Sequence, residues 1–196
     1  MSEPPVLPRF IAVAAIDESR GLGIKGDLPW HLPGDLKHFA KTTTQTTDPT
    51  QKNAVIMGRV TCETIPEKYW PLPGRHNVVI TRNRDFAIDG ADVFTDLPSA
   101  LLDVRDKVET IYLVGGGQIY SLGIELDACE ELILTRIHRD FGCDAFFPQY
   151  QDRFSLAEEL GQGEHKGLRY VIERWQRNVD AATVGTASDQ QVLHEQ

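Results

Sequence analysis

The sequence is poor in cysteine and lacks any excess of positive charge. Its three cysteines, Cys62, Cys129 and Cys143, are odd in number, far apart and without a CxxC or His-paired spacing. They indicate neither a disulfide framework nor a zinc or other metal site, and we expect a reducing, cytoplasmic location. The 29 acidic against 20 basic side chains give a formal charge of -9. That balance argues against nucleic acid or an anionic membrane as a partner.

Long apolar runs are also missing. The apolar run at residues 10–16 is too short for a membrane span or for the core of a signal peptide, and residues 1–9 are polar and rich in proline. We therefore expect no targeting segment. Residues 180–196 are rich in Ala, Thr, Asp and Gln and show no apolar periodicity. We predict one folded domain over residues 1–178, followed by a disordered tail over residues 179–196.

Short apolar runs with β-branched residues recur along the chain and predict strands. They lie at residues 10–16, 53–57, 77–81, 91–94, 110–114, 131–138 and 168–175. Helical patterns fall between them at residues 33–42, 60–65, 97–106 and 117–124. Strands that alternate with helices favour an α/β fold with a mostly parallel central sheet of about eight strands and flanking helices. No helix separates the last two strands, which we expect to pair antiparallel at the edge of the sheet.

A glycine pattern at residues 21–26 matches the dinucleotide-binding motif GxGxxG and follows the first strand. That motif needs a helix to begin at the glycines, so that the helix N-terminus can hold a pyrophosphate. Pro29 and Pro33 interrupt the stretch that follows, which keeps it irregular. We interpret it instead as a flexible loop over the mouth of a pocket.

Two other segments, residues 54–61 and 113–120, do run from a strand through glycine into a helix. Such turns present free backbone N–H groups, and both are candidate phosphate-binding sites. For Gly58, in the first segment, a purely steric role in the turn is the commoner explanation. The triple glycine of the second segment favours a close approach of a ligand to the backbone.

Two arginines could bind an anion in this otherwise acidic protein. Arg59 follows the first of these turns and Arg82 follows the strand 77–81, so both could lie at adjacent C-terminal strand ends. A pair of guanidinium groups suits a phosphate monoester, which it binds through bidentate hydrogen bonds. Charge alone leaves a solvated surface role equally open for both.

One acidic side chain, Asp35, falls on an otherwise apolar helix face. Pro33 suits the first turn of this helix. Leu32, Leu36 and Phe39 share the face of Asp35 at helical spacing. A carboxylate in such an apolar slot could accept two parallel hydrogen bonds from the N–C–N edge of a flat heterocycle, and burial would raise its pKa. The alternative is a favourable interaction of Asp35 with the helix dipole.

Two flanking segments add candidate contacts to this slot. Leu28 and Trp30 precede the helix and are expected to line the slot from the loop side, although an aromatic residue beside proline is more often plain packing. The proline-rich turn at residues 71–75 presents Arg75, which could bind a carboxylate of the ligand.

Taken together, these segments closely resemble dihydrofolate reductases across residues 10–175. The matching stretches, in the family's order and spacing, are residues 12–15, 21–30, 55–59, 71–75, 114–120, 134–137 and 146–148. The resemblance implies reduction of 7,8-dihydrofolate to tetrahydrofolate, with a hydride from NADPH reaching pterin C6 and a proton reaching N5 through water. It also implies binding of antifolates such as methotrexate or trimethoprim. We expect a cytoplasmic monomer without nucleic-acid or membrane partners.

The resemblance assigns roles to particular residues. Asp35 would hold the pterin 2-amino group and N3, Thr135 would bridge to Asp35, and Leu28 and Trp30 would admit and position the water that delivers the proton. The implied substrate site comprises Val13, Ala14, Ala15, Asp35, Leu36, Phe39, Ile65, Leu72, Arg75 and Thr135. Arg75 would bind the α-carboxylate of the substrate's glutamate.

The implied NADPH site lies mainly on the glycine turns and the two arginines. It comprises Ala15, Leu22, Gly58, Arg59, Thr61, Thr81, Arg82, Val114, Gly116, Gly117 and Tyr120. Arg59 and Arg82 would bind the 2′-phosphate, which agrees with the argument from charge.

Three features depart from the usual family pattern or vary within it. Cys62 stands where Trp is usual, and Ala145 stands where a hydroxyl residue is common. Residues 67–70 lengthen the turn before Pro71, as in some members. We expect altered packing behind the cofactor and altered hydrogen bonding between loops, without loss of the substrate carboxylate.

Two rival hypotheses remain at this point. The first is a reductase of riboflavin synthesis with the same fold, which needs neither the spacing from Trp30 to Asp35 nor Arg75. The second is a pterin-binding module that has lost catalysis. The sequence argues against the second only because Asp35, Trp30, Leu28 and the two cofactor arginines are all present.

Overall fold

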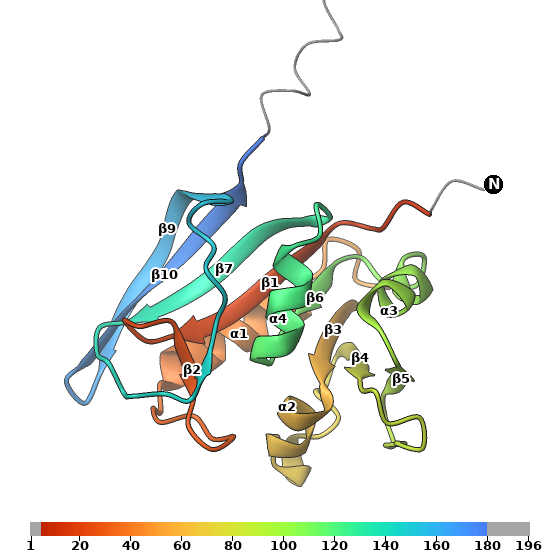
Figure 1. Ribbon diagram of the computed structural model, residues 1–196, viewed down its shortest axis with the longest axis horizontal. Helices are drawn as coiled ribbons and strands as arrows, with labels where there is room; N and C mark the ends of the chain where they lie inside the picture. Colours follow the sequence, from red (N-terminus) through yellow and green to blue (C-terminus); the bar gives the residue numbers. More distant parts are fainter. Residues whose placement is uncertain (1–4, 180–196) are drawn as a thin grey trace, which may run out of the picture.

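The computed structural model describes residues 5–179, in which eight strands form the central sheet (Figure 1). In sheet order they are β5 (Asp92–Phe94), β4 (Arg75–Ile80), β3 (Asn53–Gly58), β6 (Ile111–Leu113), β1 (Phe10–Ile16), β7 (Cys129–Ile137), β10 (Leu168–Arg177) and β9 (Phe154–His165). The pairs from β5 through to β7 are parallel. The pairs of β10 with β7 and with β9 are antiparallel. The predicted α/β fold, with a mostly parallel sheet and an antiparallel edge, is confirmed.

Helices cover both faces of this sheet. They are α1 (Pro33–Thr44), α2 (Arg59–Thr64), α3 (Leu97–Val104) and α4 (Gly117–Ile124), with a 3-10 turn at Glu67–Tyr69. In Figure 1, α4 lies in front of the sheet and α1 behind it. One apolar core joins α3 and α4 to the sheet. A second core lies on the other face and includes Leu32, Cys62 and Trp30. Because both faces are covered, β3 reads as the continuous apolar run Ala54 to Met57, which is fully buried.

All seven predicted strands and all four predicted helices are present, and their ends differ from prediction by two residues or fewer. In the central sheet, the strand that prediction missed is β9. Its sequence, FSLAEELGQGEH, is acidic and glycine-containing, and most of its residues are exposed. Because β9 lies at the edge of the sheet and is largely exposed, its sequence does not alternate regularly between apolar and polar residues. That alternation is the signal on which strand prediction depends.

The segment after β1 contains a short strand, β2 (Gly21–Gly23), which pairs with β8 (Ala145–Phe146). A further bridge joins Ile24 and Asp27. Between residues 5 and 32 no helix is present, so rejection of the dinucleotide motif at residues 21–26 is confirmed. The stretch is less irregular than expected, because β8 supplies a partner that lies more than a hundred residues away. Its flexibility stays a prediction.

The predicted tail falls almost wholly on residues 180–196, which lie outside the described residues, so the domain boundary stays a prediction. Within residues 5–179, no helix has both the length and the apolar character to cross a membrane.

Candidate active site

Asp35 is the third residue of α1 and lies half-buried beside β7. Thr135 of β7, which is 3% exposed, donates a hydrogen bond from its Oγ1 to Asp35 Oδ1 at 2.6 Å. Burial raises the pKa of Asp35, and the hydrogen bond from Thr135 and the positive charge of His38 offset this only in part. The predicted bridge between Thr135 and Asp35 is therefore present as a direct contact. A half-buried carboxylate with a raised pKa is typical of functional sites.

The apolar helix face around Asp35 is only partly turned inward. Leu32 is 2% exposed and Phe39 is partly buried, but Leu36 is 48% exposed. The Leu36 side chain therefore does not pack into the core. An apolar surface left open beside a carboxylate is available to a flat ligand.

Trp30 and Leu28 occupy the segment that leads into α1. Trp30 is 8% exposed, and its ring packs on Phe141 with a centroid distance of 5.3 Å. Its Nε1 is buried without a hydrogen-bond partner among the described residues. Because a buried N–H is costly to leave unpaired, this donor fits a polar atom of a ligand or a bound water. Leu28 is 58% exposed and lies at the surface of the loop.

The other predicted substrate contacts lie largely on the same side of the sheet. Val13 belongs to the core on the α1 face, and Ala15, Phe39, Ile65 and Leu72 pack against it. Ala14 belongs to the core on the opposite face, because successive side chains of a strand alternate. The structure therefore does not bring the Ala14 side chain to this group.

Arg75 is held in a defined position at the start of β4. Its guanidinium donates from Nη1 to Thr43 Oγ1 at 2.9 Å and from Nε to the Pro73 carbonyl at 3.1 Å. The side chain is 9% exposed, and this burial lowers the pKa of Arg75. The Phe39 ring centroid lies 5.9 Å from its Cζ. Within residues 5–179 no carboxylate bonds this guanidinium, which is therefore suited to receive one from a ligand.

Two residues that position Arg75 were missed by sequence reasoning. Thr43 lies two helical turns beyond Asp35, and the i, i+4, i+8 spacing of Asp35, Phe39 and Thr43 could have revealed it. Asn77 clamps the turn before β4: it accepts from the Leu72 N–H at 3.1 Å and donates to the carbonyls of Leu72 and Arg75 at 3.0 and 3.1 Å. No local pattern marks Asn77.

The two glycine turns lie against each other at the C-terminal ends of β3 and β6. The Gly58 N–H donates to the Gly115 carbonyl at 2.8 Å. A Cβ atom at Gly116 would lie 3.0 Å from Thr61 Oγ1, and one at Gly58 would lie 3.0 Å from Ile119 Cγ1. Close packing therefore explains why residue 58 is a glycine, in agreement with a purely steric role in the turn. Gly116 caps α4 without a side chain, which leaves the first N–H groups of that helix bare.

Leu22 and Tyr120 connect these turns with β1. A Cβ atom at Gly117 would lie 3.7 Å from Leu22 Cδ1, so the loop after β1 reaches the start of α4. The Tyr120 hydroxyl donates to the Val13 carbonyl at 2.6 Å, and the residue is 3% exposed. The pKa of Tyr120 is raised, mainly by burial and to a smaller extent by the negative charge of Asp35. Tyr120 thus supports β1 from within the core.

Arg59 and Arg82 follow adjacent strand ends, as predicted. Gly58 pairs with Ile80, so the two arginines follow the last residues of β3 and β4. Arg59 Nη1 bonds both carboxylate oxygens of Glu63, at 2.7 and 2.8 Å. Sequence reasoning missed this acidic partner, although the i, i+4 spacing marks it.

The remaining predicted cofactor contacts, Thr81 and Val114, directly follow β4 and β6, the two strands that flank β3 in the sheet. Thr81 is 8% exposed and accepts from the Asn83 N–H at 3.1 Å. Val114 is partly buried beside the core on the α1 face.

The two departures from the family pattern have clear structural settings. Cys62 is 3% exposed, and burial raises the pKa of its thiol to about 11. Next to Ala145, Asp144 makes the bonds between loops: its N–H donates to the Gly23 carbonyl at 3.0 Å, and its Oδ2 accepts from the Lys25 N–H at 2.8 Å. Contacts from Asp144 therefore join the two loops without a hydroxyl group at residue 145.

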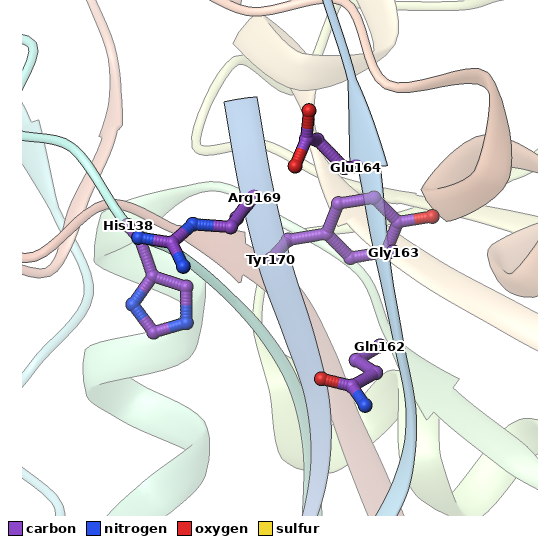
Figure 2. Close-up of a pocket in the computed structure, with 6 residues that line it drawn as sticks. All are labelled: His138, Gln162, Gly163, Glu164, Arg169 and Tyr170. Atoms are coloured by element: carbon purple, nitrogen blue, oxygen red, sulfur yellow. The ribbon is translucent and has the colours of Figure 1, made fainter. Parts of the chain in front are cut away.

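A shallow hollow of about 430 Å³ lies at the β9–β10 hairpin, lined by His138, Gln162, Gly163, Glu164, Arg169 and Tyr170 (Figure 2). In Figure 2 the Tyr170 ring crosses β9 at Gly163, whereas His138 and Arg169 lie on the other side of β10. The Tyr170 hydroxyl lies so close to Gly34 of α1 that a Cβ atom added at Gly34 would overlap it. Strand alternation thus places the polar side chains of the hollow on the face opposite α1. The hollow is not part of the site around Asp35.

Comparisons with known proteins agree with this geometry. A family model described as dihydrofolate reductase matches residues 9–177. A dihydrofolate reductase of Drosophila melanogaster is 38% identical over 171 residues, which covers 83% of this chain and 94% of the fly protein. The dihydrofolate reductase of Aedes albopictus is 35% identical, and the match covers 87% of this chain and 98% of the mosquito protein. The dihydrofolate reductase of Cryptococcus neoformans is 33% identical, and the match covers 87% of this chain and 96% of the fungal protein.

The chain therefore belongs to the dihydrofolate reductase family. The predicted class, a reductase that uses a nicotinamide cofactor, is confirmed. The matches favour this family over the related reductase of riboflavin synthesis.

Proposed function

We propose that this protein reduces 7,8-dihydrofolate to 5,6,7,8-tetrahydrofolate with NADPH in the cytoplasm, as a monomer. The observation that carries the proposal is the hydrogen bond of 2.6 Å from Thr135 Oγ1 to Asp35 Oδ1 beside an open apolar surface. That bond leaves Oδ2 of Asp35 free to accept from an N–H of a pterin. The Thr135 oxygen, which donates to Asp35, can itself accept from the 2-amino group.

The site separates substrate binding from protonation. Asp35 anchors and polarises the pterin ring and does not need to reach N5. The unpaired N–H of Trp30 can hold a water, which delivers the proton to N5 when the exposed Leu28 admits it. Arg75, fixed by Thr43, would bind the α-carboxylate of the substrate's glutamate through a charged hydrogen bond.

Several features of the structure support the cofactor contacts proposed for this chain. When bound, reduced nicotinamide supplies the hydride for pterin C6. The bare N–H groups at the start of α4 suit a phosphate group, and Arg59 and Arg82 follow neighbouring strands where a 2′-phosphate could lie between them. Tyr120 supports β1 beside the nicotinamide position through its bond to the Val13 carbonyl.

A direct assay tests the proposal. Purified full-length protein is mixed with NADPH and dihydrofolate, and the loss of NADPH absorbance is followed. A parallel reaction contains the ribosylaminopyrimidine of riboflavin synthesis in place of dihydrofolate. Turnover of dihydrofolate alone, inhibited by methotrexate, is the expected result. Turnover of the pyrimidine, or of neither compound, would contradict the proposal.

A further inference from the structure

Asp17 is a buried carboxylate outside the proposed contacts with substrate and cofactor. It directly follows β1 and is 2% exposed. Its Oδ1 accepts from the N–H groups of Ser19 at 2.9 Å and Gly21 at 2.6 Å. Its Oδ2 accepts from the Phe141 N–H at 3.0 Å and from the Cys143 thiol at 3.5 Å. A buried carboxylate is tolerated only when its oxygens are bonded in this way.

The two oxygens of Asp17 serve two different segments of the chain. Oδ1 binds the segment 17–30, which leads to α1, and Oδ2 binds the segment 138–147, which follows β7. Burial of the thiol and its proximity to Asp17 raise the pKa of Cys143 to about 11, so the thiol keeps its proton and can donate. Asp17 is thus the shared acceptor of both segments.

Two other side-chain bonds between these segments are more exposed than those of Asp17. Ser19 Oγ donates to Asp140 at 2.7 Å, and the Lys25 N–H donates to Asp144 at 2.8 Å, both at exposed positions. Charge-assisted bonds away from water are stronger than solvated ones. Close approach is also built in at Gly21, because a Cβ there would lie 2.5 Å from Cys143 Sγ and 2.7 Å from Asp17 Oδ2. Asp17 is therefore a buried fastening between the segments, in addition to the pairing of β2 with β8.

The segment 138–147 reaches the substrate site through Phe141. The Phe141 ring packs on Trp30 with a centroid distance of 5.3 Å and an interplanar angle of 57°. Trp30 carries the buried, unpaired indole N–H. We propose that Asp17 is a positioning residue, which fixes the backbone of Phe141, holds its ring against Trp30 and so aims the indole N–H at the water that delivers the proton to the pterin. This role rests on the proposed dihydrofolate reduction.

Asp17→Asn is the sharpest test, because the amide keeps one acceptor oxygen and turns an NH₂ group toward the other set of donors. One of the two segments must lose its bond. We expect the rate of hydride transfer in a single turnover to fall about tenfold, since small misplacements of a positioned group have effects of up to about a hundredfold. The affinities for NADPH and methotrexate should stay within about twofold, since no binding contact is removed.

Control variants separate positioning from a general loss of structure. Asp140→Asn removes a charge and exposed bonds from the same segment and should leave the rate unchanged. Phe141→Leu keeps the bonds of Asp17 but removes the ring on Trp30, and it should slow the reaction as Asp17→Asn does. In a Trp30→Phe background, Asp17→Asn should have little further effect, because the N–H that it aims is already missing.

The outcomes decide the proposal. An unchanged rate in Asp17→Asn, or the same loss with and without Trp30→Phe, would overturn the positioning role. Hydrogen exchange needs no substrate and should be faster at the Gly21 and Phe141 amides in Asp17→Asn; unchanged protection of both amides would refute the fastening itself. If the wild type showed no turnover, the proposed function would be overturned, and with it the role of Asp17 in the reaction. The exchange measurement would still test whether Asp17 fastens the two segments.

Discussion

Replacing Asp35 by asparagine should separate what the carboxylate does for the reaction from what it costs the fold. The amide keeps an oxygen that can accept from Thr135 Oγ1, now at 2.6 Å from Asp35 Oδ1, but it presents an NH₂ group where the pterin also has donors. At least one charged hydrogen bond is lost, which is worth about 1.5 to 3 kcal/mol, or roughly 10- to 150-fold in kcat/KM. NADPH affinity should change little, because no proposed cofactor contact is altered.

The same substitution should stabilise the protein at neutral pH. Burial raises the pKa of Asp35 above its ordinary value of 3.8, so the folded state binds more protons than the unfolded state between the two pKa values. The wild type therefore loses stability as the pH rises through this window, and the cost is fully present above it. Asparagine carries no such charge. We expect a gain on the order of 1 kcal/mol, or about 2–4 °C in melting temperature, at pH 7.5.

Thermal melts and steady-state kinetics of the same samples check both parts. The difference in melting temperature between Asp35→Asn and the wild type should grow from pH 4.5 to pH 7.5. Thr135→Val is the companion variant: it removes the donor that favours the charged carboxylate and should destabilise the protein where Asp35→Asn stabilises it. A variant Asp35→Asn that is less stable than the wild type at pH 7.5, or as active as the wild type, would refute the reasoning.

Two further sites give sharp predictions. Thr43→Val leaves a buried N–H of Arg75 unpaired and frees its guanidinium to move, so KM for dihydrofolate should rise about tenfold with the hydride step almost unchanged, whereas the exposed Thr44→Val should alter neither. Arg59→Ala combined with Arg82→Ala should lower the preference for NADPH over NADH by at least about tenfold in titrations of both cofactors. Glu63→Gln releases Arg59 from an exposed pair and should tighten NADPH by about twofold without affecting NADH; weaker NADPH binding would show that Glu63 holds Arg59 in its working position.

The strands and helices could be predicted wherever local sequence carries the cause of the structure. Buried parallel strands such as β3 must be apolar throughout, and α1 starts at a proline that suits a first turn. The edge strand β9 and the small pair of β2 with β8 could not be found, since exposed residues or distant partners decide them. Register and order of the strands likewise depend on contacts between residues far apart in the sequence.

The site was predictable to the extent that single residues reveal it. Asp35 stood out as an acid on an apolar face, and the two glycine turns stood out by their position between strand and helix. Their partners did not: Thr135 lies a hundred residues from Asp35, and Thr43 lies 32 residues from Arg75. Only the resemblance to a family pointed to Thr135, and nothing in the sequence pointed to Asn77 or Asp17.

The charged groups of the site lie in surroundings that destabilise them, and this is why they are candidates for a functional role. Burial raises the pKa of Asp35 and lowers that of Arg75, so in both residues the surroundings disfavour the charged form. Asp17 is more deeply buried than either residue, yet four donors surround its carboxylate, and it serves the fold. Asp35 and Arg75 have neutral hydrogen-bond partners and no opposite charge in a salt bridge within residues 5–179. A ligand with an amidine-like edge and a carboxylate would complete both groups at once, which is the pattern that a folate presents.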